Sequence, residues 1–501
     1  MRVVLTPDQM RAMEQRYFNE TGVPSLDLME TAAKQLADRL YCRSDGGRVY
    51  IACGTGGNGG DGLAAARILR SRGVEAEILL PEPPKSDDAK KNLERAREAG
   101  VPVHGAEAFE ALPEPELWCD ALFGIGLTRA PAGEAARLIG RMNASAAPVV
   151  AADVPSGLDA RTGCAHPACV RAVETVTFQC LKTGQVLADG LDCCGEVTTV
   201  DIGIPEALLP GDAARLIEPE DAARLLKPRP RNMHKGVAGQ LLLVAGSFGM
   251  AGAAAIAATA ALRMGVGLVT IACPGSIVPI LQTLAPCATC LPMPEYDGAL
   301  SAEAAGPIKD ALFGKTAVAV GCGLSRHASK EVVRVVLESG LPAAIDADAL
   351  NIISATPELR ALLGPRHVLT PHPGEAARLL GRASSDPFTG ARQLRELGAT
   401  AILKGASSVI AGEGCYISAA GTQGMARGGS GDALLGVLGA LLAEGVNPCV
   451  PEAERLTVAA ALACQIHGLA GEAAAAAHTA RAMTSMDLAH SLEKVFCAYG
   501  G

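Results

Sequence analysis

The chain has 501 residues, more than the roughly 100–200 of one ordinary domain, so at least two domains are expected. Hydrophobic residues make up 49% and charged residues 19%, which excludes a disordered or fibrous chain and predicts large buried cores. The 44 basic and 53 acidic residues give a net charge of −9, and no cluster of Lys and Arg is interleaved with aromatics. Nucleic acid is therefore not expected as a partner.

The sixteen cysteines show no disulfide framework, and the first residues lack the layout of a secretory signal peptide, so a reducing, cytoplasmic location is expected. The one CxxC, Cys287 and Cys290, has no second CxxC or His pair nearby, which favours buried thiols over zinc. The longest apolar stretches are interrupted by Arg263, Glu444 or glycine before about 18 apolar residues accumulate, so no membrane span is expected.

Short apolar runs alternate with amphipathic segments along the first part of the chain. This alternation is typical of βαβ units and predicts an α/β domain with a parallel sheet. The predicted elements are helices at 8–20, 26–41, 63–73, 87–99 and 133–145, strands at 48–54, 76–80 and 117–124, and a strand and turn at 149–159.

The alternation stops at residues 204–236, where proline and charged residues are dense and KPRPR cannot be helical. We place a domain boundary there, which divides the chain into residues 1–215 and 216–501. A second α/β series follows without repeating a motif of the first, so two different α/β domains are expected. Its elements are strands at 240–246, 267–273, 317–323, 343–350, 367–375 and 400–407, and helices at 251–265, from GGSGD (428–432) to 443, at 452–473 and at 485–496.

A glycine-rich segment, GTGGNGGDG (54–62), joins a predicted strand to a predicted helix. It matches the GxGxxG dinucleotide fingerprint, but Asn58 and Asp61 make it longer and more polar than that tight turn, which argues against a Rossmann oxidoreductase. Its glycines still allow backbone N–H groups to approach a phosphate at the helix start. Phosphate binding is expected, and a turn that only packs is the alternative.

Short oxygen-bearing side chains follow neighbouring strands of the first domain. Asp120 and Asp153 stand at strand ends, Ser156 follows in the next turn, and Asn58 lies in the glycine segment. In an open α/β sheet, ligands bind beyond the carboxyl ends of the strands. Asn58, Asp120 and Ser156, with backbone carbonyls, could therefore form a hard-cation site. Taken singly, each is more often a helix cap or turn residue.

In the second domain the GGSGD segment opens a helix, and its glycines and N–H groups suit a transferring phosphoryl group. Asp432 in the same turn could accept a proton from a substrate hydroxyl, and its alternative role is a helix N-cap. The chain has no GxxxxGK[ST] motif, so it is not a P-loop enzyme.

Further polar residues follow other predicted strands of the second domain. Lys404 could meet nucleotide phosphates, although a lysine there is otherwise a solvated surface charge. His372 follows a strand whose end faces the same crevice, although a lone histidine is more often structural. Asp346 and Asp348 could help to organise Mg²⁺ and its waters, or could cap a helix.

The segments CGTGGNGGDG, DALFGIGL, DVPSGLDA and TFQCLKTGQ (177–185) closely resemble the N-terminal domain of the NAD(P)H-hydrate epimerases. The second half resembles the ADP-dependent NAD(P)H-hydrate dehydratases, a branch of the ribokinase-like superfamily. The resemblance runs from about residue 5 to about residue 495, with its motifs in order. It implies an N-terminal Rossmann-like three-layer α/β/α domain and a C-terminal ribokinase-like α/β domain.

The resemblance implies a role for each matched residue of the first domain. The nucleotide would be contacted by Gly57, Asn58, Gly59, Gly60, Asp61, Gly124, Ile125, Gly126, Leu127, Thr128, Arg129, Ala130 and Asp153, and potassium would be held by Asn58, Asp120 and Ser156. Asp153 is also the candidate catalytic residue there. Gly57 departs from the family, where a second Asn is common, so only a backbone contact is retained at that position.

Carried over to the second domain, the resemblance places the hydrated nucleotide against Ala253, Gly323, His372 and Asp432, with Asp432 as the catalytic base. The adenine nucleotide would be held by Lys404, Gly405, Ala406, Ser407, Ser408 and Gly431. Three departures stand out: Cys322 replaces a usual Pro, KGASS is less glycine-rich, and Arg427 replaces a common Thr. Arg427 could add a phosphate contact.

The implied activity is metabolite repair. The first domain would interconvert R and S hydrates of NADH and NADPH, and the second would use ADP and Mg²⁺ to dehydrate the S form, releasing AMP and phosphate. The expected partners are these small molecules, without nucleic acid or membrane, and a homo-oligomer is compatible with the sequence. Two alternatives stay open: an ATP-dependent small-molecule kinase fused to a nucleotide-binding module, and a non-catalytic interaction module.

Overall fold

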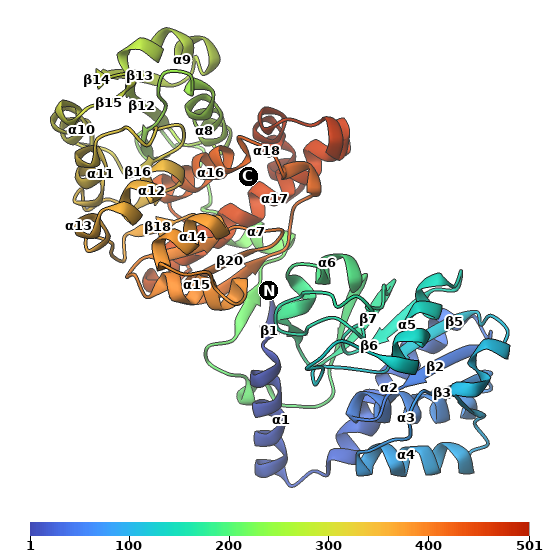
Figure 1. The fold of residues 1–501 in the computed structure, drawn as a ribbon. Coiled ribbons are helices and arrows are strands. Elements are labelled where there is room, and N and C mark those ends of the chain that lie inside the picture. The colour runs from blue at the N-terminus through green and yellow to red at the C-terminus, as the bar shows by residue number, and fades with distance from the viewer. Residues whose placement is uncertain (500–501) are drawn as a thin grey trace. The chain divides into compact units, whose positions relative to one another are not determined.

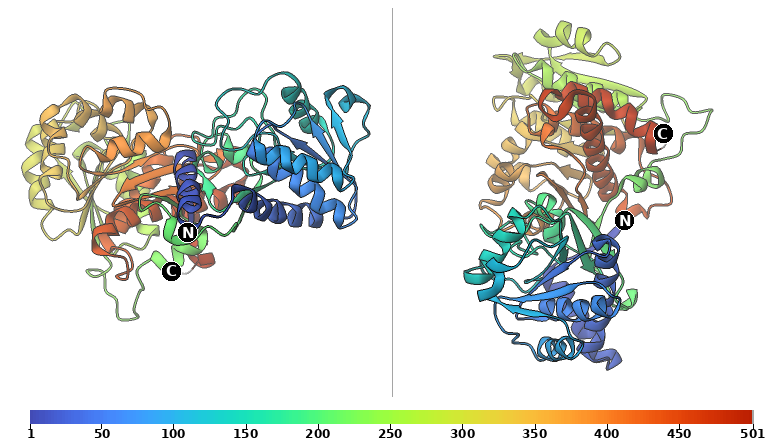
Figure 2. Two further views of the ribbon diagram at one scale, coloured as in Figure 1. Left: turned by 90° about the horizontal axis from the view of Figure 1, so that it is seen from below. Right: turned by 90° about the vertical axis from the view of Figure 1, so that its right-hand side faces the viewer.

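The computed structural model describes residues 1–499. The chain folds into two compact units, one formed by Arg2–Ala213 and the other by the chain from Ala214 onward (Figure 1). Each unit has its own sheet with helices packed on it (Figure 2).

The N-terminal unit is built on a seven-stranded parallel sheet in the order β4-β3-β2-β5-β6-β7-β9, and β1 pairs in parallel with β8. Its elements are β1 (Arg2–Leu5), α1 (Pro7–Thr21), α2 (Ser25–Ser44), β2 (Val49–Cys53), α3 (Gly57–Ser71), β3 (Ala76–Leu80), α4 (Asp87–Glu98), β4 (Val103–Gly105), β5 (Leu117–Ala121), α5 (Gly133–Ala144), β6 (Val149–Ala152), β7 (Glu174–Phe178), β8 (Leu181–Lys182), α6 (Gly190–Cys193) and β9 (Glu196–Val200).

Alternation along the central strand β2 divides the apolar side chains between two cores, one on each face of the sheet. Val49, Ile51 and Cys53 pack with α2, α3 and α4, whereas Tyr50 and Ala52 pack with residues of β5 and α5. All five side chains are fully buried, because a strand turns successive side chains to opposite faces and helices cover both. This is the three-layer α/β/α arrangement expected from the sequence.

The C-terminal unit also has a mainly parallel sheet. Its strands follow the order β13-β12-β11-β16-β17-β18-β19-β20-β21-β10, with antiparallel pairing only at β19-β20 and β20-β21 in the described residues. The elements are β10 (Ala214–Leu216), α7 (Pro219–Leu225), β11 (Gln240–Val244), α8 (Ala251–Arg263), β12 (Leu268–Pro274), α9 (Val278–Leu284), β13 (Thr289–Met293), β14 (Glu295–Tyr296), β15 (Ala299–Leu300), α10 (Ala305–Ala311), β16 (Ala317–Val320), α11 (Lys330–Leu337), β17 (Ala343–Ile345), α12 (Ala347–Ala355), α13 (Pro357–Arg360), β18 (His367–Leu369), α14 (Pro373–Leu380), α15 (Pro387–Arg395), β19 (Thr400–Leu403), β20 (Ser408–Gly412), β21 (Gly414–Ser418), α16 (Ser430–Glu444), α17 (Arg455–Ala482) and α18 (Ser485–Tyr499).

Helices α8, α16, α17 and α18 share one large alanine- and leucine-rich core with the sheet. Among the described residues, one segment, Glu452–Ala482, is long and apolar enough to cross a membrane by length and composition. It contains α17, and 83% of its apolar window is buried inside the unit. That burial assigns α17 to the protein core, where α16 and α18 cover it.

Two expectations for the elements differ from the structure. The apolar run 343–350 was expected as one strand, but β17 ends at Ile345 and α12 begins at Ala347, whose φ of 48° forms the turn between them. Among the strands that were not predicted are β7, β9, β13, β20 and β21, each of which is paired with a neighbouring strand of its sheet.

Candidate active sites

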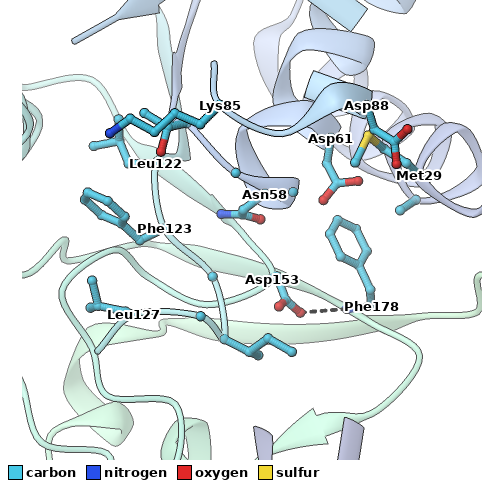
Figure 3. Close-up of a pocket in the computed structure, with 18 of the residues that line it drawn as sticks. Met29, Asn58, Asp61, Lys85, Asp88, Leu122, Phe123, Leu127, Asp153 and Phe178 are labelled. Carbon is cyan, nitrogen blue, oxygen red and sulfur yellow. Dashed lines mark hydrogen bonds between the residues drawn. The ribbon is translucent and has the colours of Figure 1, made fainter. Parts of the chain in front are cut away.

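The N-terminal unit contains a cavity of about 890 Å³ beyond the carboxyl ends of its central strands. Its walls are the glycine segment after β2, the loop at residues 122–132 after β5, and one side of α1 and α2. Figure 3 shows Asn58 and Asp61 of α3, Asp153 after β6 and Phe178 at the end of β7 pointing into the same space. The cavity therefore lies where ligands bind in open α/β sheets.

Two glycines of the 54–62 segment, Gly54 and Gly59, are required by close backbone contacts. A Cβ at Gly54 would lie 1.7 Å from the Leu122 carbonyl oxygen, and one at Gly59 would lie 2.0 Å from the Gly54 oxygen. The segment is not a separate loop, because α3 begins at Gly57 rather than near residue 63 as expected. Glycine is a poor helix former, and packing against the strand ends overrides that preference here.

The expected nucleotide-binding residues divide into two groups. Gly59 and Gly60 are buried away from the cavity, and a Cβ at Gly60 would meet the Met29 sulfur at 2.6 Å. The cavity wall contains the rest of the expected set: Gly57, Asn58, Asp61, Gly124, Ile125, Gly126, Leu127, Thr128, Arg129, Ala130 and Asp153.

The Asn58 side chain has an unsatisfied amide. Its Oδ1 and Nδ2 are both buried, and neither has a hydrogen-bond partner among the described residues. A Cβ at Gly124 would lie 3.3 Å from Asn58 Cγ and 3.4 Å from Asp153 Oδ2. Because Gly124 has no side chain, the space beside these two groups stays open. A buried amide without partners is costly, which indicates that a ligand or ion completes this position.

Asp120 and Ser156 are joined by hydrogen bonds behind the cavity. Ser156 donates from Oγ to Asp120 Oδ1 at 2.6 Å and from its backbone N to Oδ2 at 2.7 Å. Phe123 N donates to Ser156 Oγ at 2.8 Å, which ties the pair to the loop after β5. Burial raises the pKa of the Asp120 carboxyl to about 6, although the bonds from Ser156 and Leu122 oppose that shift.

Asp153 forms a buried ion pair with Lys182, which sequence reasoning did not single out. Lys182 Nζ donates to Asp153 Oδ1, to Thr177 Oγ1 at 2.9 Å and to the Phe178 oxygen at 2.9 Å, and the lysine side chain is only 1% exposed. Asp153 has a φ of 63° at the end of β6, and its own carbonyl accepts a bond from Gln185. The available sequence signal was its place in TFQCLKTGQ (177–185), one of the segments that carry the family resemblance.

In the C-terminal unit, Asp432 lies in the first turn of α16. The N-cap is Gly429, with a φ of 90° and no side-chain cap, so Asp432 is not the N-cap. Burial, with Asp346 and Asp348 nearby, raises the pKa of the Asp432 carboxyl to about 6, and Lys404 opposes the shift. A half-buried carboxylate with this pKa suits a general base near neutral pH.

The N-terminus of α16 faces an ion pair formed by strand-end residues. Lys404 follows β19, Asp346 follows β17, and Lys404 Nζ lies 2.7 Å from Asp346 Oδ1. A Cβ at Gly431 would lie 3.5 Å from Lys404 Nζ and 3.6 Å from Asp346 Oδ2. The pKa of Lys404 is raised above its usual value. Burial acts to lower this pKa, but the negative charges of Asp346, Glu375 and Asp432 outweigh that effect. Lys404 is therefore not the solvated surface charge that was the alternative.

The remaining expected residues lie at the same edge of the sheet. His372 caps α14 by accepting a bond from Gly374 N at 3.0 Å, and its side chain is 53% exposed. The preceding Pro371 oxygen accepts from Lys404 N at 3.0 Å. A Cβ at Gly323 would lie 2.9 Å from the Ala253 side chain, so these two residues are in close contact. Residues 405–407 form the turn between β19 and β20, and Ser408 begins β20.

His467 holds the GGSGD turn, and Arg427 lies directly before that turn. His467 of α17, which sequence reasoning missed, is buried, and its Nε2 donates to the Ser430 oxygen at 2.9 Å. Burial lowers the pKa of His467 to about 4, so it stays neutral. Arg427 donates to the carbonyl oxygens of Gly424 and Ala480, and its contact with a phosphate stays a prediction.

Comparison with known proteins covers nearly the whole chain. A family model described as YjeF-related protein N-terminus matches residues 25–184, and one described as NAD(P)H-hydrate dehydratase matches residues 241–494. The bifunctional NAD(P)H-hydrate repair enzyme of Moorella thermoacetica is 37% identical over 97% of this chain and 95% of its own length. That of Escherichia coli is 34% identical over 97% and 93%. A solved ADP/ATP-dependent NAD(P)H-hydrate dehydratase from Bacillus subtilis is 27% identical and covers 57% of this chain and 99% of its own, with a TM-score of 0.47.

Proposed function

The chain belongs to the family of bifunctional NAD(P)H-hydrate repair enzymes, and on that premise we propose how its two units divide the work. The N-terminal unit interconverts the R and S hydrates of NADH and NADPH. The C-terminal unit dehydrates the S hydrate to NAD(P)H at the expense of ADP and releases AMP and phosphate. The observation that carries this proposal is that each unit has charged groups buried beyond its strand ends: Asp153 with Lys182, and Asp432 with Lys404.

Epimerisation acts on one carbon. Water adds to the ring enamine so that the hydroxyl lies on the carbon next to the ring nitrogen, and R and S hydrates differ there. Asp153 is held by Lys182 through Oδ1, while Oδ2 faces the space beside Gly124. The fixed carboxylate is therefore placed to exchange a proton with the hydrated ring.

A potassium ion fits the N-terminal site. Asn58 has an amide without partners, and Asp120 and Ser156 are linked to the same wall through Phe123 and Gly124. We assign Asn58, Asp120 and Ser156 as ligands of the potassium ion, together with backbone carbonyl oxygens. The ion would supply a fixed positive charge that attracts the anionic nucleotide.

In the C-terminal unit, Asp432 takes the proton from the S-hydrate hydroxyl, and that oxygen attacks the β-phosphorus of ADP. The bond to the bridging oxygen breaks and AMP leaves. The phosphorylated hydrate then loses phosphate with the C–O electron pair, the neighbouring carbon gives up a proton, and the ring C=C bond is restored. The N–H groups of α16 and Lys404 stabilise the phosphoryl charge.

Mg²⁺ and ADP fit the same place. Gly431 has no side chain, so the space before the Lys404–Asp346 pair stays open for phosphate groups. Asp346 and Asp348 would hold Mg²⁺, which would shield the charge of the phosphates.

The sixteen cysteines all carry free thiols within residues 1–499, which supports a cytoplasmic location.

The test is the return of NADH absorbance from purified hydrates. S hydrate with ADP and Mg²⁺ should regain the absorbance of NADH and release AMP and phosphate in equal amounts. A stable phosphorylated product without NADH would instead show the small-molecule kinase. Omission of ADP and omission of Mg²⁺ are the controls.

A further inference from the structure

One face of α1 forms part of the wall of the N-terminal cavity. Met10, Glu14 and Phe18 are spaced four residues apart and all three line the cavity. Residues at this spacing share one face of a helix. Glu14 is the only charged member of this stripe, and the apolar side chains of Met10 and Phe18 flank it. No cation stands beside this carboxyl within the stripe, and its apolar neighbours therefore favour the neutral, protonated form.

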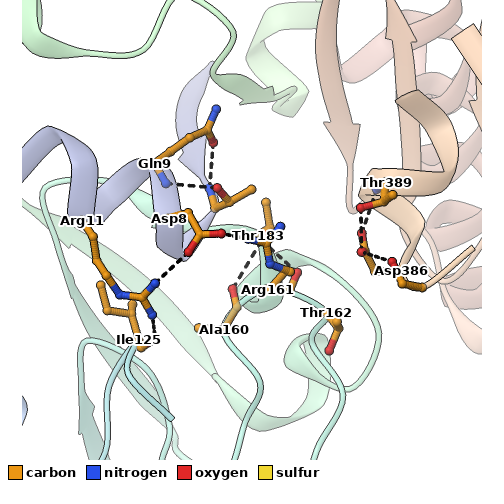
Figure 4. Close-up of polar contacts among 12 residues, drawn as sticks. Asp8, Gln9, Arg11, Ile125, Ala160, Arg161, Thr162, Thr183, Asp386 and Thr389 are labelled. Atoms are coloured by element: carbon orange, nitrogen blue, oxygen red, sulfur yellow. Dashed lines mark hydrogen bonds and ion pairs between the residues drawn. The ribbon is translucent and has the colours of Figure 1, made fainter. Parts of the chain in front are cut away.

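The position of α1 is fixed against the loop that covers the cavity. Arg11 donates to the Ile125 carbonyl oxygen at 2.8 Å and to Asp8 at 2.8 Å, and Asp8 also pairs with Arg161 (Figure 4). Ile125 belongs to the loop after β5 that lines the cavity. The turn of α1 that carries Glu14 is thus tied to the expected nucleotide-binding loop.

Three carboxyl groups, Glu14, Asp61 and Asp153, share the inner cavity with one lysine, Lys182. Lys182 is bound to Asp153, so the other two carboxyls have no cation in contact within residues 1–499. Burial raises the pKa of Glu14 to about 7, with Lys182 and Arg11 lowering it and Asp153 raising it. Burial and the neighbouring Asp153 and Glu14 also raise the pKa of Asp61 well above its usual value. The other charged residues of the wall are Glu82, Lys85, Asp88 and Arg129.

We propose that Glu14 is a catalytic acid of hydrate epimerisation, which gives its proton to the hydroxyl that leaves the ring. This inference rests on the proposed epimerase function and adds a residue to it. The C–O bond breaks, its electron pair takes the Glu14 proton, and water departs while the nitrogen lone pair forms a C=N⁺ bond. Water then adds to the other face, and the C=N⁺ pair returns to nitrogen. The proton of the added water passes to Asp153 and returns to Glu14 through the solvent of the cavity.

The primary test is Glu14→Gln, which keeps the shape and removes the acid. Enzyme-catalysed R-to-S conversion, measured above the spontaneous rate, should fall by about 10²–10⁴-fold, while ADP-dependent dehydration of S hydrate stays unchanged. Glu20→Gln is the matched control, because Glu20 lies on the same helix, pairs with Arg16 and has a side chain that is 51% exposed. It should retain the wild-type rate, and a wild-type rate for Glu14→Gln would overturn the proposal.

A pH profile separates an acid from a merely structural carboxyl. Wild-type R-to-S conversion should decline as pH rises above about 7, since Glu14 loses its proton there. Glu14→Gln should lack that decline, and Glu14→Asp should restore part of the rate. Melting temperature should not fall in Glu14→Gln, because a carboxyl with a raised pKa weakens the folded state once it ionises. A lower melting temperature with parallel loss of both activities would assign Glu14 a structural role and contradict the proposal.

Asp153→Asn distinguishes failure of this inference from failure of the proposed function. If Asp153→Asn abolishes R-to-S conversion and Glu14→Gln does not, Glu14 is not the acid but the epimerase assignment stands. If wild-type protein itself does not accelerate the conversion, the proposed function fails, and the role of Glu14 fails with it.

Discussion

Replacing Lys182 by Met tests whether the buried Asp153–Lys182 pair holds the N-terminal unit together. The lysine is 1% exposed and donates to three oxygens, on Asp153, Thr177 and Phe178. Met fills a similar volume but leaves the Asp153 carboxylate buried without its cation. Removing one partner of a buried pair costs about 3–5 kcal/mol, so we expect the free energy of unfolding of this unit to fall by that amount.

The single tryptophan makes this measurement selective. Trp118 is fully buried in β5 of the N-terminal unit, so its fluorescence during urea unfolding reports on that unit. Lys90→Met is the control: Lys90 also pairs with a carboxylate, Asp87, but both side chains are exposed, so the change should be below about 1 kcal/mol. The double variant Lys182→Met/Asp153→Asn should regain most of the loss. A loss below about 1 kcal/mol for Lys182→Met would show that the pair does not stabilise the N-terminal unit.

Three further predictions concern the two reactions. Asp153→Asn should slow R-to-S conversion by about 10²–10⁴-fold and leave S-hydrate dehydration nearly intact, and an unchanged rate above the spontaneous one would remove Asp153 from the mechanism. Asp120→Ala should also slow R-to-S conversion, and excess KCl should restore part of the variant's rate. Equal rates of this variant in KCl and in a salt of a large organic cation would contradict the potassium site. Dehydration of S hydrate should rise with pH through about 6, where Asp432 becomes ionised, and Asp432→Asn should lower kcat strongly with a modest change in the KM for ADP. A pH-independent kcat with normal turnover of the variant would exclude Asp432 as the base.

The sequence predicted those parts of the sites that stand in dense motifs. The glycine segments at 54–62 and 428–432 both open helices, and the first follows β2 directly, where backbone contacts leave no room for a Cβ at Gly54. Asp120 and Asp153 could be named because they stand at the ends of apolar runs, which predict strands, and Asp432 because it ends the GGSGD segment that opens a helix. Parallel strands bring their carboxyl ends to one edge, so proximity followed from topology.

Other residues of the sites could not be predicted from local pattern. Glu14 stands among polar residues of a helix, Lys182 in the TFQCLKTGQ segment and His467 in an apolar stretch, and only the tertiary structure shows which groups surround each of them. The hydrogen bond from Arg427 to Ala480 could not be predicted, because the two residues lie 53 positions apart in the chain. The helical start at Gly57 was missed because glycine propensity argues against it and packing decides it.

The most direct test of the whole account is NADH recovery from purified R hydrate in the presence of ADP and Mg²⁺. The wild-type protein should regenerate NADH faster than spontaneous epimerisation allows, because both units act in sequence. Asp153→Asn should be limited to the spontaneous rate, Asp432→Asn should accumulate S hydrate without NADH, and mixing the two variants should restore recovery. Recovery by wild type that is no faster than spontaneous epimerisation, or full recovery by Asp432→Asn alone, would contradict the account.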